Sequence, residues 1–318
     1  MVLIEGLIPQ GVQMASVLLL SPLLVGITRK MKARLLRRQG APLLQPYRDI
    51  LRLLRKTPVL AENASWLFRA APYLILAFTW LAAALVPTFT TGLVFNRTAD
   101  LIAIVALLAS ARFLLALAGM DIGTSFGGIG SSREMMISAL AEPAMMMVVF
   151  TLALIAGSTQ LSGIASYMAS SAVGLRVSLG LALVALMIVA LAENARIPVD
   201  NPATHLELTM VHEAMVLEYS GRHLAMIELA AAVKLLLYVS LIGCIFVPWG
   251  LAQAGGGWEA YALAGVFYLG KLAVAACLLA LFETSIAKMR VFRVPDFLNV
   301  ALMMGLLATL LLYVTGRF

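Results

Sequence analysis

Long apolar runs recur along the whole chain, and they constrain its fold more than any other feature of the sequence. About eight runs are long enough to cross a bilayer, which needs roughly 20 apolar residues per helix. Of all residues, 62% are hydrophobic and only 12% are charged, whereas soluble domains average about 45–50% and 25%. The sequence therefore predicts one all-α, polytopic integral membrane domain over residues 1–318. The expected spans are 7–28, 70–91, 99–120, 135–158, 174–196, 225–250, 259–283 and 297–315.

Lysine and arginine orient these spans, because cytoplasmic loops of membrane proteins are enriched in both. Of the 23 basic residues, seventeen fall on one side of the predicted bundle and three on the other. Both termini are therefore expected in the periplasm, with a basic cytoplasmic loop at 29–69 and an acidic cytoplasmic loop at 197–224. We expect the chain in the cytoplasmic (inner) membrane of a bacterium or archaeon. Because the basic excess already serves to orient the spans, the net charge of +7 is no sign of nucleic-acid binding.

The acidic loop and the residues just before it gather carboxylates at the membrane boundary. Asn201 and Pro202 read as an N-cap and a first helical residue, so a helix is predicted to begin there. On that helix Glu207 and Glu218 would share a face. Two interpretations remain open at this point: a solvated loop, or a carboxylate row whose shared protonation responds to an event nearby. Five of the sixteen acidic residues fall within 191–221: Glu193, Asp200, Glu207, Glu213 and Glu218.

Charged residues also lie inside the predicted spans, where an unpaired charge costs about 2.5–3.5 kcal/mol. Arg112 and Glu142 lie about eight residues from the inward ends of their spans, which places them roughly 12 Å deep at 1.5 Å per residue. Lys234 and Lys271 lie deeper in theirs. A relay that gives up and regains a proton would explain the two lysines functionally. Ion pairing would explain them structurally, with three candidate carboxylates: Glu142, Glu228 and Glu283.

The segment 47–56 in the basic loop alternates basic and apolar residues with helical spacing. This pattern is typical of a short helix that lies in the membrane interface. Its basic side could serve only as an anchor or could dock a soluble partner. The partner-docking residues we expect here and elsewhere are Arg48, Asp49, Arg52, Arg133, Glu134 and Tyr219.

Cysteine usage argues against a redox centre. The two cysteines, Cys244 and Cys277, lie in separate apolar runs. Iron–sulfur clusters usually need four thiolates, and structural zinc sites need four Cys or His ligands. We therefore expect no cofactor, no metal and no catalytic residue in this chain.

Three segments carry a resemblance to a known family: GAPLLQPYRDILRLLRK at 40–56, SSREMMISALAEP at 131–143 and AENARIPVDNPATHLELTMVHEAMVLEYSG at 192–221. Together they resemble complex I subunit 1, a membrane subunit of NADH-quinone oxidoreductase. The sequence after Ile197 is more similar to the branch found in membrane-bound [NiFe] hydrogenases, which includes formate hydrogenlyase subunit 4 and the hydrogenase-4 membrane subunit. In complex I, this membrane subunit joins the hydrophilic redox arm to the proton-pumping arm.

The resemblance implies roles for particular residues. The five acidic residues of 191–221 would match the family's acidic funnel, and Glu142 would belong to the membrane end of the same path together with Arg133 and Glu134. With Lys234 and Lys271 they form the expected coupling path. The implied partners are hydrogenase large and small (iron–sulfur) subunits, antiporter-like membrane subunits and the lipid bilayer. Nickel–iron, flavin or iron–sulfur centres would then reside in the partner subunits.

Three functions compete at this point. The first is a subunit that couples electron transfer to proton or sodium translocation, with a quinone-reducing complex I subunit 1, which would also bind quinone, as its alternative. The second is a stand-alone secondary transporter, which commonly shows two structural repeats; no such repeat is evident in the sequence. The third is an inert anchor, which would not need costly charges inside its spans. The sequence favours the first.

Overall fold

A computed structural model describes residues 2–170, 176–200, 210–252 and 257–314. Its elements are helical, and the only β-type contacts in these ranges are two isolated bridges. The helices are α1 (Val2–Leu35), α2 (Gln45–Leu54), α3 (Trp66–Leu85), η1 (Val94–Arg97), α4 (Leu101–Asp121), α5 (Ser125–Ala156), α6 (Leu161–Ala169), α7 (Val177–Glu193), α8 (His212–Val216), α9 (Gly221–Phe246), α10 (Trp258–Ser285), η2 (Val291–Arg293) and α11 (Val294–Val314).

Each of the eight predicted spans overlaps one helix of the described ranges, which confirms the polytopic all-α fold. Within the described ranges, seven helices are long and apolar enough to cross a membrane. The eighth, α7, has 17 residues, which gives about 25 Å at 1.5 Å per residue and lies at the short limit for a membrane helix. It ends at Glu193 because Ala195 has a positive φ of 47°, a conformation that cannot continue a right-handed helix.

Side-chain caps fix where several spans begin. Ser65 accepts a hydrogen bond from the Leu67 amide at the start of α3, and Asp100 accepts one from the Ile102 amide at the start of α4. These caps satisfy amide groups that have no partner within the first helical turn. The loops before α3 and α4 therefore end at defined residues, Ser65 and Asp100.

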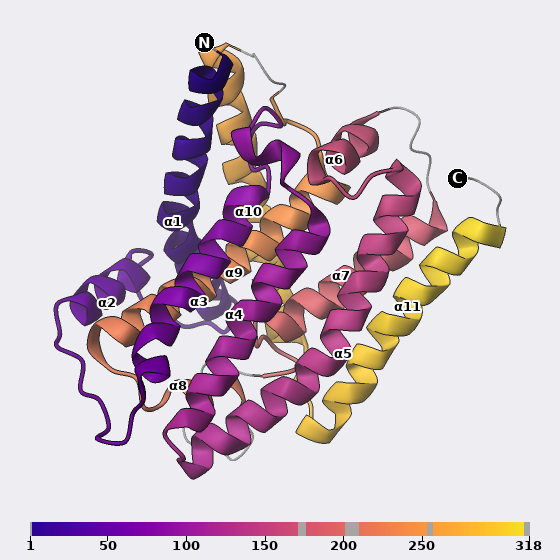
Figure 1. Cartoon of the computed structure of the whole chain (residues 1–318). Coiled ribbons are helices and arrows are strands. Elements are labelled where there is room, and N and C mark those ends of the chain that lie inside the picture. The colour runs from indigo at the N-terminus through magenta and orange to yellow at the C-terminus, as the bar shows by residue number, and fades with distance from the viewer. Residues whose placement is uncertain (1, 171–175, 201–209, 253–256, 315–318) are drawn as a thin grey trace.

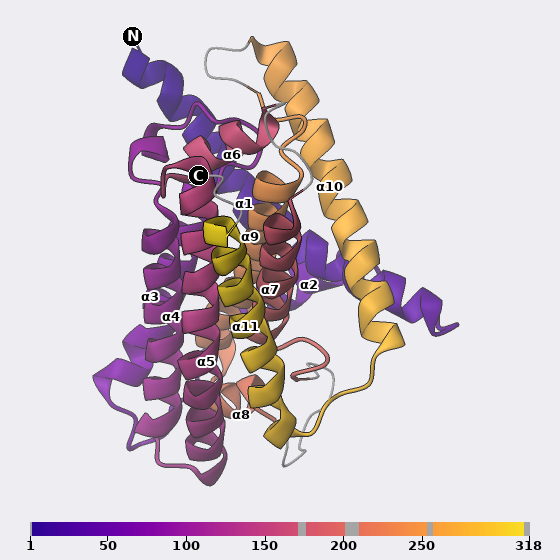
Figure 2. The ribbon, with the colours of Figure 1, turned by 90° about the vertical axis from the view of Figure 1, so that its right-hand side faces the viewer.

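The long helices form a tilted bundle (Figures 1 and 2). Helix α5 packs on α4, α7 and α11, whereas α3 packs on α4 and α9. Helix α9 crosses the middle of the bundle, and α10 runs along one edge, where α1 is its main neighbour. The start of α1 and the end of α11 lie in the upper half of both views, whereas α8 lies at the lower end. This end of the bundle is called the α8 end below.

Helix α2 lies in the predicted basic loop and packs against α1 and α9. Gly26 of α1 makes this close approach possible, since a Cβ there would lie 2.2 Å from the Leu43 carbonyl oxygen. In the predicted acidic loop, the described helix is the short α8. The helix predicted to begin at Asn201 and Pro202 lies outside the described residues.

Candidate functional site

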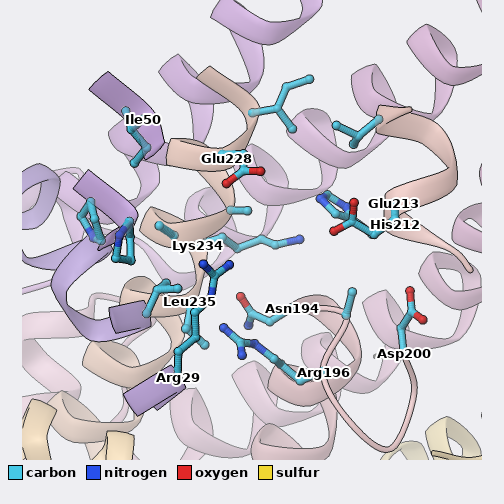
Figure 3. Close-up of a pocket in the computed structure, with 18 of the residues that line it drawn as sticks. Arg29, Ile50, Asn194, Arg196, Asp200, His212, Glu213, Glu228, Lys234 and Leu235 are labelled. Atoms are coloured by element: carbon cyan, nitrogen blue, oxygen red, sulfur yellow. The ribbon is translucent and has the colours of Figure 1, made fainter. Parts of the chain in front are cut away.

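A charged cavity of about 140 Å³ opens where α1, α2, α8 and α9 meet the segment after α7 (Figure 3). Pro22 and Val25 of α1 and Ile50 of α2 form part of its apolar wall. Ionisable side chains dominate the remainder. Those that line it are Arg29, Asp49, Glu193, Arg196, Asp200, His212, Glu213, Glu228 and Lys234. This space is called the charged cavity below.

Arg112 of α4 connects this cavity with the interior of the bundle. It forms ion pairs with Glu193 and with Glu134, the latter at 3.4 Å between Nε and Oε1. It also donates a hydrogen bond of 2.7 Å to the Ser138 hydroxyl. All three charged side chains are buried. Burying a charge is costly unless it is paired, so this group of one cation and two carboxylates constrains the positions of α4, α5 and α7.

Lys234 of α9 lines the charged cavity, as Glu193 does. In Figure 3 its amine points across the charged cavity toward His212 and Glu213. Lys234 and His212 also line a second, smaller cavity of about 30 Å³, whose wall includes Arg112 and Glu134. The two residues therefore border both cavities.

His212 sits in an environment that favours its neutral form. Burial lowers the pKa of His212, and the nearby charge of Lys234 lowers it further. Glu213, Glu134 and Asp200 oppose this shift because a negative charge stabilises an imidazolium. The downward shift prevails, so His212 is neutral near pH 7.

Ionic contacts hold the segment after α7 in place. The buried Glu283 of α10 accepts ion pairs from Lys32 at 3.1 Å and from Arg196 at 3.2 Å. Asp200 pairs with Lys288 at 3.1 Å and accepts a hydrogen bond from the Val211 amide. These contacts connect the ends of α1 and α10 to the wall of the charged cavity.

The Tyr219 ring is buried and stacked on Phe68, with their ring centroids 3.9 Å apart. Its hydroxyl donates a hydrogen bond of 3.0 Å to the Phe68 carbonyl, and burial raises the pKa of this phenol. Tyr219 therefore anchors the segment after α8 to α3, although the sequence had suggested it as a docking residue. Arg133 likewise turns inward and donates to the Met210 carbonyl at 2.9 Å.

The structure gathers only part of the predicted site. Glu193, Asp200, Glu213, Lys234 and Asp49 line the charged cavity, and Glu134 lies behind it. The half-buried Glu142 lies two turns farther along α5. The exposed Glu218 follows α8, whose five residues end at Val216, so it does not lie on a helix face. Glu207 lies outside the described residues.

Three other predicted residues lie apart from the cavity. Arg48 and Arg52 are exposed on the far side of α2. Lys271 lines a separate, largely apolar cavity between α9 and α10. It donates a hydrogen bond to the Val247 carbonyl, and within the described ranges no carboxylate lies within ion-pairing distance of it.

Several residues of the site had no role predicted from the sequence. The sequence did indicate that Arg112 needs a partner, because a single arginine inside an apolar span is costly unless it is paired. His212 had no local pattern around it, and its position depends on the fold of the segment after α7. The missed residues are Arg29, Arg196 and His212, whereas Arg112, Glu228 and Glu283 had been noted only as charges inside the spans or as candidate ion-pair partners.

In the described part of the chain, no group of three or more His, Cys, Asp or Glu side chains is arranged to hold a metal ion. Cys244 is buried and Cys277 is exposed, and neither forms a disulfide.

Known proteins share both the sequence and the fold. The NADH dehydrogenase family matches residues 10–314. Formate hydrogenlyase subunit 4 of Escherichia coli (strain K12) is 35% identical over 86% of this chain and 88% of its own. Hydrogenase-4 component C of the same strain is 35% identical over 76% of this chain and 75% of its own.

More distant relatives extend the match. NADH-quinone oxidoreductase subunit 8 of Rhodothermus marinus is 29% identical over 73% of this chain and 70% of its own. A chain of the membrane-bound sulfane sulfur reductase, an archaeal respiratory membrane complex, has the same fold with a TM-score of 0.79 and 21% identity. That match covers 98% of this chain and 99% of the other. This multi-pass membrane protein therefore belongs to the NADH dehydrogenase family, the complex I subunit 1 type.

Proposed function

We propose that this chain couples electron transfer in a multi-subunit oxidoreductase to the movement of protons or sodium ions across the membrane. The membrane subunits of formate hydrogenlyase, hydrogenase-4 and NADH-quinone oxidoreductase among its relatives support a role within a complex. Hydrogenase large and small subunits and antiporter-like subunits are the partners we propose. Their redox centres would supply the electron transfer, and this chain would respond to it.

A single observation carries the proposal: Arg112 binds one carboxylate that lines the charged cavity and another that lies behind it. Glu193 belongs to the cavity wall, and Glu134 borders the smaller cavity. Because one arginine neutralises only one of these carboxylates, a proton added to either one changes how strongly Arg112 holds the other. The Oε2 atom of Glu193 has no hydrogen-bond partner in the described ranges, so it is available to hold such a proton.

The other charged groups of the cavity determine when that proton moves. A negative charge arriving near the mouth of the cavity raises the proton affinity of its carboxylates, because like charges close together cannot all ionise cheaply. His212 is neutral and can accept a proton on one ring nitrogen while it donates from the other. Lys234 lies beside it and borders the smaller cavity. A proton can therefore pass from the cavity toward Glu134 and Glu142.

The test replaces Glu193 by Gln in the whole complex, in sealed vesicles. The amide keeps the size of the side chain and removes its charge and its ability to hold a proton. We expect electron transfer to continue and the coupled ion movement to fall close to background. The matched control is Glu62→Gln, which changes an exposed carboxylate away from the cavity. Normal ion movement by the Glu193 variant would exclude this residue from the coupling path.

A further inference from the structure

The outward side of α2 presents one stripe of basic and apolar residues. Arg48, Leu51, Arg52 and Arg55 follow the i, i+3, i+4, i+7 spacing that places side chains on the same face of a helix. With Lys56 they surround a shallow hollow. Leu51 is 55% exposed, and all four basic side chains are exposed as well. Within the described ranges, no other element of the chain lines this hollow.

The inward side of α2 is fixed, so the helix cannot roll to bury this stripe. Pro46 is buried, and its ring lies against Gly26 of α1, 3.5 Å from where a Cβ would be. The Tyr47 hydroxyl donates to the Leu19 carbonyl of α1. Asp49 and Ile50 line the charged cavity. The stripe is therefore held away from the bundle.

Further leucines on the segments next to the stripe in the sequence are also exposed. They lie at the end of α1, in the connection to α2 and on α2 itself, and they are between 41% and 55% exposed. Exposed leucines beside arginines are typical of a helix in the membrane interface, with its apolar part among acyl chains and its cations at the headgroups. These leucines are Leu35, Leu36, Leu43, Leu44 and Leu54.

The charge around the hollow is almost entirely positive. Asp49 is the acidic residue of α2, and it is already bound by Arg52 at 3.2 Å and by the Gln45 amide at 2.9 Å. Arg48, Arg55 and Lys56 border the hollow without an ion pair to a described carboxylate. Arginine holds phosphate oxygens through two parallel hydrogen bonds, so the hollow suits a phosphate ester.

We propose that the outward side of α2 binds the headgroup of an anionic phospholipid, with Leu51 and Leu54 in the adjoining acyl region. The lipid belongs to the leaflet that the basic loop faces. Basic clusters next to a membrane span attract anionic headgroups in this way. Since Asp49 and Ile50 on the inward side line the charged cavity, a lipid bound outside also steadies one wall of that cavity. The binding does not depend on the proposed coupling function.

The test measures lipid retention by the full-length chain. Wild-type and variant chains, purified in detergent, are equilibrated with mixed micelles of phosphatidylcholine and cardiolipin, and the cardiolipin bound per chain is measured by native mass spectrometry. The variant is R48Q/R55Q, which spares the Arg52–Asp49 ion pair. The control is R290Q/R293Q, which removes two exposed arginines far along the sequence from α2.

We expect R48Q/R55Q to lower cardiolipin affinity roughly 30-fold, from the usual contribution of two basic residues near a membrane surface, and the control to bind as the wild type does. Raised salt should weaken wild-type binding more than that of the variant. Equal losses in variant and control would mean non-specific attraction and overturn the proposal. Unchanged lipid binding by R48Q/R55Q, together with loss of a soluble subunit from the complex, would identify the stripe as a protein-docking surface instead.

Discussion

Arg112 of α4 and Glu193 of α7 form an ion pair at the point where the charged cavity meets the interior of the bundle. Only 3% of the Arg112 side chain and 5% of the Glu193 side chain are exposed. The pair joins two spans that are far apart in the sequence. Because Arg112 also holds Glu134 of α5, its charge connects three helices.

Replacing Arg112 by Met tests this role. The variant leaves Glu134 and Glu193 buried without a cation, so we expect a loss of about 3–5 kcal/mol of stability. The thermal unfolding midpoint of the purified chain in detergent should fall clearly. Adding Glu134→Gln and Glu193→Gln to the variant should restore most of the loss, because no unpaired charge then remains. A triple variant as unstable as the single one would show that Arg112 acts through packing.

The pH dependence of stability should report on His212. Its folded-state pKa lies below the ordinary value of 6.5, so the folded state binds this proton less readily than the unfolded state does. The contribution of His212 is therefore present above pH 6.5 and is lost as the pH falls below that value. Between pH 7 and pH 5, the unfolding midpoint of the wild type should decline more steeply than that of His212→Gln. Parallel declines would mean that His212 titrates normally.

The sequence predicted the spans well because apolar length alone determines whether a helix crosses a bilayer. It predicted the ion pairs poorly, because each joins side chains that only the packing of distant helices brings together. Glu283 illustrates this: it was one of three candidate partners for Lys234 and Lys271, but it binds Lys32 and Arg196. The tilt of α9 across the bundle (Figure 1) places Lys234 at the charged cavity, and no residue spacing encodes that tilt.

Glu283 should protect the segment after α7 from proteolysis. It accepts ion pairs from Lys32 and Arg196 while its own side chain is only 1% exposed. Glu283→Gln leaves these two cations without their carboxylate, and we expect the backbone near Arg196 to open more often. Limited trypsin digestion of the purified chain should then cleave after Arg196 several times faster than in the wild type. Asp296→Asn, an exposed change beyond these ion pairs, serves as the control.

The predicted orientation can be tested with single cysteines in a chain that carries Cys244→Ala and Cys277→Ser. Arg38 lies in the basic loop, whereas Trp258 begins α10; both side chains are exposed. With the basic loop in the cytoplasm, an impermeant thiol reagent should label Trp258→Cys in intact spheroplasts. Arg38→Cys should react only after the membrane is opened. The reverse pattern would invert the topology.

Gly221 is a position at the α8 end where even a single methyl group should destabilise the fold. It has a positive φ of 54°, and a Cβ there would lie 2.7 Å from the Lys56 carbonyl oxygen. The backbone cannot easily withdraw, because the Ser220 hydroxyl accepts from the Val59 amide and donates to the Val59 carbonyl. We therefore expect Gly221→Ala to lower the stability by at least about 1–2 kcal/mol from the left-handed conformation alone, with a lower unfolding midpoint.

Gly128→Ala is the matched control. This exposed helical glycine has no atom within 4 Å of the added Cβ, so alanine should raise the stability by about 0.5–1 kcal/mol. If Gly221→Ala instead unfolds at the wild-type temperature, the segment 56–59 must move freely away from α9, and the anchoring role of Ser220 fails.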